Sequence, residues 1–304
     1  MPLNAARQQN SLGIGLRVAA MFCMACLGAI VKWCSGRGVP VMEIVFFRNA
    51  FAFIPVLIYV ARTSGFQILR TERPLSHLAR SLIGLTAMIC GFSALGLLPL
   101  TLSTAISFSS PLFMTALSAL VLGEFVGRHR WGAVAVGFLG VLIMVHPDPA
   151  HFGSIGTALA LVSAFAAAGA TITIREIGRT EPGPTIVFYF TLAGAVAGLL
   201  SLPFGWVAPD PSTIALLVLG GLLGGVGQLM LTEALRRAPV AVLAPFDYSQ
   251  LVWASLLGFM VWGEKPHLTT LVGAVLVAGS GVYILYRELR RIGPGDPDPV
   301  VMPN

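Results

Sequence analysis

Residues 99–124 read PLTLSTAISFSSPLFMTALSALVLGE, and residues 239–264 read PVAVLAPFDYSQLVWASLLGFMVWGE. The two stretches align without a gap at an offset of 140 residues (239 minus 99), from the first proline to the last glutamate. Each stretch is an apolar run that opens with Pro and closes with Gly-Glu. A duplicated hydrophobic unit is typical of membrane transporters that are built from two related halves around a central solute site.

The composition predicts an all-α membrane protein. Of the 304 residues, 56% are hydrophobic and 11% are charged, whereas soluble domains carry about 25% charged residues. Lipid must therefore solvate most of the surface, and each helix must satisfy its own backbone hydrogen bonds. The net charge of +6 does not indicate nucleic-acid binding, because the Lys and Arg residues are spread over short loops. We expect lipid, and no nucleic acid, as a partner.

Ten apolar segments are long enough to cross a bilayer, which takes about 20 helical residues. Pro and Gly residues separate them. In the eighth, Gly220/Gly224 and Gly221/Gly225 form small-xxx-small patterns that favour close helix packing. The predicted spans are 12–34, 40–61, 75–97, 101–122, 130–146, 154–174, 184–202, 213–234, 240–262 and 268–287.

The positive charges predict the orientation of these spans. Most of the 19 Lys and Arg residues fall on one side, which places both termini in the cytoplasm. The fourth and ninth spans then run in opposite directions, so the sequence predicts a five-plus-five inverted repeat. The predicted units are a cytoplasmic N-terminus (1–11), the first repeat (12–146), the second repeat (154–287) and a disordered cytoplasmic tail (288–304).

These features resemble the EamA-type members of the drug/metabolite transporter superfamily. The resemblance rests on the ten spans, the Ala-Leu…Pro boundary before the fourth span, and the Pro-containing fourth span that closes with Gly-Glu. The glycine-rich run GAVAVGFLGVLI (132–143) returns as GAVLVAGSGVYI (273–284), and Phe47-Arg48 is similar to an aromatic-Arg pattern of the family. Two departures are Phe188 at the counterpart of Arg48 and Asp247 at the counterpart of Ser107.

The resemblance implies a solute carrier of the inner membrane that works by secondary transport. The stretch that begins at Arg80 looks most like the branch associated with S-adenosylmethionine and riboflavin uptake. We therefore expect uptake of a ring-bearing or nucleoside-like metabolite by a monomeric carrier, with coupling to a proton or a counter-solute. Export of amino acids or drugs is the alternative within the superfamily.

Polar residues deep in apolar spans are the candidates for solute binding. In the fourth span, Pro111 frees a carbonyl near residue 107, and this carbonyl can line a polar cavity together with Ser107, Phe108 and Ser110. The same pattern is also expected of a simple proline kink in which a neighbouring serine satisfies the carbonyl.

The matching part of the ninth span holds Phe246, Asp247, Tyr248 and Gln250. Desolvation favours the neutral form of Asp247, which makes it the candidate for proton coupling or for binding a cationic group. Alternatively, Asp247 pairs with an arginine such as Arg236 near the cytoplasmic mouth. Aromatic rings here can face a ring-bearing solute or serve only packing.

Further candidates lie in other spans. Gln228 sits among glycines and can reach the solute or only a neighbouring helix. Lys32 and Glu43 are candidates for a gate, in which they pair with each other and leave Arg48 free to bind an anionic group. A structural ion pair or snorkelling to the interface is the alternative for all three residues.

Other classes of function lack their motifs. The five His residues are scattered singly, without metal-ligand spacing, and the sequence predicts no metal and no cofactor. There is no GxxxxGK[ST] phosphate loop, and no GxSxG or HExxH pattern that an enzyme would need. A non-transporting scaffold or a channel remains the rival class.

Overall fold

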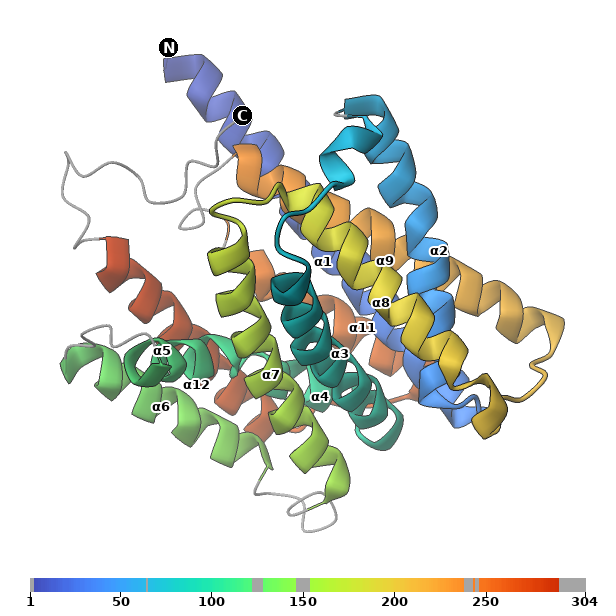
Figure 1. Ribbon diagram of the computed structural model, residues 1–304. Helices are drawn as coiled ribbons and strands as arrows, with labels where there is room; N and C mark the ends of the chain where they lie inside the picture. The colour runs from blue at the N-terminus through green and yellow to red at the C-terminus, as the bar shows by residue number, and fades with distance from the viewer. Residues whose placement is uncertain are drawn as a thin grey trace.

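The computed structural model describes residues 3–289 except 64, 122–127, 146–153, 238–242 and 244–245. Within these residues the chain is helical and contains no strand (Figure 1). Two short 3-10 helices, η1 (Phe66–Leu69) and η2 (Leu202–Phe204), accompany the α-helices. The α-helices are α1 (Leu3–Gly36), α2 (Val41–Thr63), α3 (Pro74–Leu97), α4 (Leu100–Ser107), α5 (Ser110–Val121), α6 (Arg128–Val145), α7 (Ile155–Ile177), α8 (Gly183–Leu200), α9 (Pro211–Arg237), α11 (Ser249–Trp262) and α12 (Leu268–Leu289).

In the described part of the chain, seven helical segments are long and apolar enough to cross a membrane. Three further apolar helices are shorter: Trp131–Ile143, Ser249–Trp262 and Leu268–Tyr283. Together they lie at the ten predicted positions, but the shorter three do not reach full span length, so the count of ten crossings stays a prediction. Many large apolar side chains, such as Leu142, Val275 and Phe259, are exposed on the outside of the bundle, as lipid contact requires.

The ends of the chain differ from the expected boundaries. Helix α1 begins at Leu3, well before residue 12, where the first span was predicted to start. Helix α12 continues to Leu289, just past the start of the predicted tail at 288. The rest of that tail, and the predicted connection 146–153 between the repeats, lie outside the described residues.

The predicted fourth span is broken. Helix α4 ends at Ser107, and α5 begins at Ser110, directly before Pro111. Two carbonyls at the end of α4 accept serine hydroxyls, from Ser107 Oγ to Thr104 O and from Ser109 Oγ to Ile106 O, each at 2.7 Å. Serines therefore satisfy the carbonyls of Thr104 and Ile106 next to the break; both interpretations of the carbonyl that Pro111 frees stay predictions.

The main helix contacts join the first half of the chain to the second. Helix α1 packs along α9, α3 along α7, α2 along both α8 and α9, and α6 along α12. Helix α11 contacts α1 and α4. In Figure 1, α2, α8 and α9 gather at one side of the bundle, and α5, α6 and α12 lie at the other.

Glycines bring α9 close to α2, as the small-xxx-small pattern predicts. A Cβ atom added at Gly221 would lie 2.6 Å from the carbonyl oxygen of Phe47, and one added at Gly225 would lie 3.0 Å from Ala52 Cα. Neither position has room for a side chain. This close packing holds α2 and α9 against each other along one wall of the candidate site.

Candidate solute-binding site

A pocket lies between α2, α3, α8 and α9. The space that atoms leave unfilled in it, including the part open to solvent, is about 290 Å³. None of the described residues that line it is acidic. Its lining consists of Arg48, Ala52, Val56, Arg80, Val187, Phe190, Thr191, Gly224, Gly225 and Gln228.

Arg48 enters the pocket from α2 and is only 8% exposed. Its Nη1 donates a hydrogen bond of 2.8 Å to Oδ1 of Asn49, and the amide of Asn49 donates to Val45 O at 2.7 Å. The Nε of Arg48 is buried and has no hydrogen-bond partner. A Cβ at Gly224 would lie 3.3 Å from this Nε, so the glycine leaves room for the guanidinium.

Arg80 reaches the same pocket from α3. Its guanidinium carbon lies 3.9 Å from the centre of the Phe190 ring, and that of Arg48 lies 5.7 Å from the same centre. The Nε and Nη1 atoms of Arg80 are buried without a hydrogen-bond partner. A Cβ at Gly84 would collide with Nη1 of Arg80 and would come within 2.9 Å of the Phe190 ring. The glycine therefore makes space for this stack.

Of the candidates from the sequence, the pocket contains Arg48 and Gln228 only. The candidates of the fourth and ninth spans lie elsewhere, where α4 meets the start of α11. There the rings of Phe108 and Tyr248 contact edge to face, with centroids 5.0 Å apart. Ser107, Ser110, Phe246 and Gln250 lie in the same two segments, half-buried or exposed.

Asp247 forms an ion pair with Arg17 of α1. The guanidinium holds both carboxylate oxygens, Nε with Oδ1 and Nη2 with Oδ2, the latter at 2.7 Å. This contact matches the alternative that the sequence left open, in which Asp247 pairs with an arginine. The partner is Arg17, from the other end of the chain, because α1 packs against α11.

Lys32 and Glu43 do not pair with each other. Lys32 Nζ lies 2.9 Å from a carboxylate oxygen of Glu264 and donates to the carbonyl of Leu98 at 2.5 Å. Glu264 also accepts the backbone N–H of Leu100 at 2.8 Å. Glu43 instead accepts the backbone N–H of Val207 at 3.1 Å. The expected Lys32–Glu43 gate is therefore wrong, because the packing of α1 on α11 brings Glu264 to Lys32.

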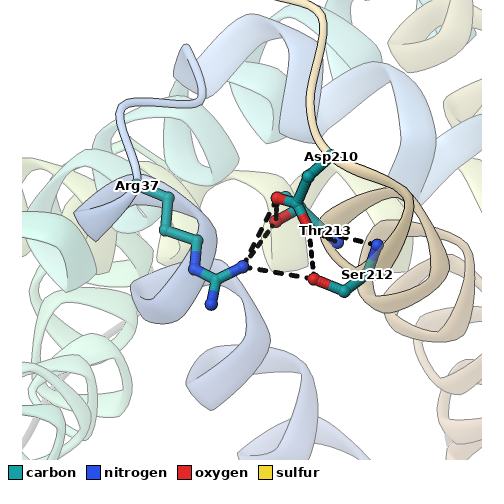
Figure 2. Close-up of polar contacts among 4 residues, drawn as sticks. All are labelled: Arg37, Asp210, Ser212 and Thr213. Atoms are coloured by element: carbon teal, nitrogen blue, oxygen red, sulfur yellow. Dashed lines mark hydrogen bonds and ion pairs between the residues drawn. The ribbon is translucent and has the colours of Figure 1, made fainter.

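A polar cluster joins the end of α1 to the start of α9 (Figure 2). Asp210 accepts hydrogen bonds from the hydroxyl and backbone N–H groups of Ser212 and Thr213, and Arg37 Nη1 lies 3.4 Å from its Oδ1. The Ser212 hydroxyl above all, then that of Thr213, holds the pKa of the Asp210 carboxyl well below its ordinary value. Asp210 thus caps α9 as a charged residue.

The sequence interpretation missed three polar residues. It named none of Arg80, His77 and Glu181 as a site candidate. His77 is 2% exposed, and its Nε2 lies 3.6 Å from Oε2 of buried Glu181. One signal was available: His77, Arg80 and Gly84 follow each other at helical spacing within a predicted span. Two ionisable residues and a glycine on one helix face indicate a polar site rather than a lipid-facing surface.

Comparison with known proteins identifies the family. The EamA-like transporter family model matches residues 11–146 and again residues 154–287. A pseudopaline exporter from Pseudomonas aeruginosa is 33% identical over 270 residues, which cover 87% of this chain and 93% of the exporter. A riboflavin transporter from Rhizobium johnstonii is 31% identical over 278 residues, covering 90% of this chain and 91% of that protein.

Two further similarities extend over nearly the full length. An S-adenosylmethionine uptake transporter from Rickettsia bellii is 28% identical over 290 residues, which cover 95% of this chain and 99% of that protein. A solved crystal structure matches in fold, with a TM-score of 0.65 and 18% identity, over 95% of this chain and 99% of that one. With two matches to one family model that together span most of its length, the chain is a member of the EamA-like transporter family of membrane proteins.

Proposed function

We propose that the protein is a secondary transporter that carries a small organic metabolite by alternating access. The solute binds in the pocket between α2 and α3 of the first half and α8 and α9 of the second half. The observation that supports this proposal is that the pocket, which contains the buried Arg48 and the half-buried Arg80, is lined by residues of both halves. Carriers with inverted repeats bind their solute at such an interface, near the middle of the bilayer.

The proposed architecture is ten spans in two inverted five-helix repeats, and contacts between counterpart residues support it. Phe108 contacts Tyr248, its own counterpart at the offset of 140. The fifth helices of the two predicted repeats, α6 and α12, also pack on each other: a Cβ added at Gly137 would meet Ser280, and one added at Gly140 would meet Val277. Contact between counterpart elements is expected around a two-fold axis.

Two ion pairs that join α1 to the segments before and after α11 suit the role of gates. Arg17 binds Asp247 just before α11, and Lys32 binds Glu264 just after it. In the proposed cycle, opening one mouth separates one of these pairs while the other holds. Asp247 is then free to accept a proton or a cationic solute group, and the polar residues of the α4–α11 contact, Ser107 and Gln250 among them, face the opened path.

The proposed solute is a ring-bearing metabolite, and the proposed direction is uptake across the inner membrane by a monomer with both termini in the cytoplasm. The Phe190 face in the pocket supports a ring-bearing solute. The similar riboflavin transporter and S-adenosylmethionine uptake transporter support uptake. Export is the second candidate, because the similar pseudopaline transporter is an exporter.

Flux through purified protein in liposomes tests the proposal. S-adenosylmethionine, riboflavin and an extract of cell metabolites are offered, and we expect saturable uptake of one solute against its gradient when a proton gradient or a counter-solute gradient is imposed. Leakage of all small solutes without saturation would indicate a channel, and absence of any flux would indicate a scaffold. Asp247→Asn, compared with wild type across pH, tests coupling: an unchanged pH profile would remove Asp247 from that role.

A further inference from the structure

The pocket holds the buried Arg48 and the half-buried Arg80, whose Nε and Nη1 atoms are buried, and no described acidic residue in its lining balances them. Arg48 comes from α2 and Arg80 from α3, and both guanidinium groups lie over the ring of Phe190. Burial of an uncompensated charge is costly, so buried charges in proteins are paired or bind ions. The described lining contains neither Asp nor Glu, and the hydrogen-bond partner of Arg48 is the neutral Asn49.

We propose that Arg48 and Arg80 together bind an anionic group of the transported solute, a carboxylate or a phosphate. This inference rests on the proposed transport function and names the class of its solute. Arg80 is then a solute-binding residue beside Arg48. Phe190 holds the two cations at a common site, and its ring and Gln228 are available to the rest of the solute.

The free donors suit an oxyanion. Three buried guanidinium nitrogen atoms have no hydrogen-bond partner: Nε of Arg48, and Nε and Nη1 of Arg80. When a guanidinium stacks on an aromatic face, its N–H groups point outward in its own plane, where they can hold two oxygens of a carboxylate or phosphate. Gly84 and Gly224, which are counterparts at the offset of 140, leave room for Arg80 and Arg48 respectively.

The position of the site indicates a solute rather than a lipid headgroup. Arg80 lies six residues into α3, which places it about 9 Å along the helix from its first residue. The pocket is enclosed by helices of both halves, α2, α3, α8 and α9. A molecule held there contacts both halves at once, and rearrangement of the halves can release it to either side.

Matched pairs of compounds test the proposal on the purified full-length protein. Riboflavin and riboflavin 5′-phosphate share a ring and differ in a phosphate, and nicotinamide and nicotinic acid differ in a carboxylate. Binding is measured by the rise in melting temperature with ligand concentration, with inorganic phosphate and sodium chloride alongside. We expect the charged member of at least one pair to bind at least about tenfold more tightly, as charge-assisted hydrogen bonds imply.

Substitutions assign the effect to the two arginines. Arg80→Gln, and separately Arg48→Gln, should abolish the preference for the charged member, and Arg80→Lys should restore it in part because the charge returns without the planar fork. Arg179→Gln is the matched control, since that side chain is 75% exposed and pairs with Glu176 on the surface; it should keep the preference. A cooperative thermal unfolding transition, measured for each variant without ligand, shows that the variant is folded.

The outcomes separate this inference from the proposed function. Equal binding of charged and uncharged members in both pairs, or a preference that survives in folded Arg80→Gln protein, would overturn the anion site even if transport is observed. A response to chloride as large as to phosphate would also overturn it, because it would show a halide site only. If the preference is present and depends on both arginines, the site stands even where liposome flux fails.

Discussion

The two halves of the chain share an apolar frame but differ in their polar residues. At the offset of 140, Arg48 corresponds to Phe188, and Arg80 to Gly220. The first half therefore supplies both cations of the pocket, whereas the second half supplies the Phe190 ring and the Gln228 amide. The two halves thus share the family unit, whereas the charged residues of the proposed site come from the first half alone. A solute without two-fold symmetry needs this asymmetry.

The contacts of the first helix in each half differ in the same way. Helix α1 contacts α11, and its counterpart α7 contacts α4 and α5. Among the described residues, Arg17 and Lys32 of α1 form ion pairs beside α11, and no such pair joins α7 to α4 or α5. At the offset of 140, Arg17 and Lys32 fall at Thr157 and Ile172. The counterpart of Asp247 is Ser107. One of the two related interfaces is thus held by charge, and the other by apolar packing.

Close packing also differs between the halves. Helix α9 approaches α2 through Gly221 and Gly225, whose counterparts in α3 are Ser81 and Leu85. Helix α2 accordingly packs more extensively on α9 than α8 does on α3. The less closely packed of these two helix pairs, α3 and α8, is the pair that contains Arg80.

The largest effect on stability is expected when Gly225 of α9 is replaced by leucine, the residue type at its counterpart in α3, Leu85. Gly225→Leu would put a Cβ 3.0 Å from Ala52 Cα and 2.5 Å from Pro55 Cγ. Overpacking of this kind costs about 1–3 kcal/mol or more, so the melting temperature in detergent should fall strongly. Gly279→Leu is the control, because nothing lies within 4 Å of a Cβ there. Equal stability of the two variants would contradict the close contact of α9 with α2.

Removing charge from the α1–α11 interface should have the next largest effect. Arg17→Gln or Asp247→Asn leaves a partly buried charge without its partner, since the two side chains are 15% and 32% exposed. We expect each to cost roughly 1–2 kcal/mol, between the values for exposed and buried pairs, and the double variant to cost less than the sum.

The control for this cycle is the exposed pair of Arg179 and Glu176, whose nearest N and O atoms lie 3.0 Å apart. Its coupling energy should be close to zero because solvent screens it. Strict additivity at Arg17 and Asp247, measured by thermal unfolding, would show that this pair does not hold the interface.

Truncating the ring contact at the counterpart positions should have a smaller effect. Phe108→Leu and Tyr248→Leu each remove one side of an edge-to-face pair, for which the coupling energy is about 0.5–1.5 kcal/mol. A double-mutant cycle on unfolding measures it. Phe108→Leu combined with Trp253→Leu serves as the control, because the Trp253 ring contacts Phe22 edge to face instead. No coupling between positions 108 and 248 would argue against a two-fold axis through them.

The smallest effect is expected at Asp210 and depends on pH. Its pKa is lowered in the folded protein, chiefly by the Ser212 hydroxyl. The carboxylate therefore stabilises the fold at neutral pH, and this contribution is lost as the pH falls below the ordinary pKa of about 3.9. Asp210→Asn should melt slightly lower than wild type at neutral pH, and the difference should shrink on acidification.

The control for Asp210 is Glu72→Gln, which neutralises an exposed carboxylate that has no such cap. The difference in melting temperature between Glu72→Gln and wild type should not shrink in the same way as the pH falls. If the melting temperatures of Asp210→Asn and wild type differ by the same amount across the acidic range, the lowered pKa of Asp210 is contradicted.

Local sequence predicted much of the helical frame but less of the site. Apolar length and Pro or Gly breaks located the helices to within a few residues in most cases, because lipid demands long internally hydrogen-bonded segments. Arg48 and Gln228 were found because a polar residue amid apolar ones is conspicuous. Arg80 was missed because it lies close to a helix end, where an arginine is equally expected as a cytoplasmic anchor.

Partners across the bundle could not be predicted from spacing. The pair of Arg17 and Asp247 joins residues 230 apart in the chain, and Lys32 binds Glu264 rather than the nearby Glu43. Such choices depend on which helix faces are in contact. That is decided by packing of small residues at many positions at once.

The sequence by itself determined that this is a helical membrane protein with a duplicated unit, because hydrophobicity and its period are properties of neighbouring residues. Only the tertiary structure decided that two arginines from α2 and α3 share one aromatic ring from α8, and that α1 is tied to both sides of α11. Those facts depend on how close the helices and side chains come to one another. Gly84 and Gly225 allow the close approach because glycine has no side chain.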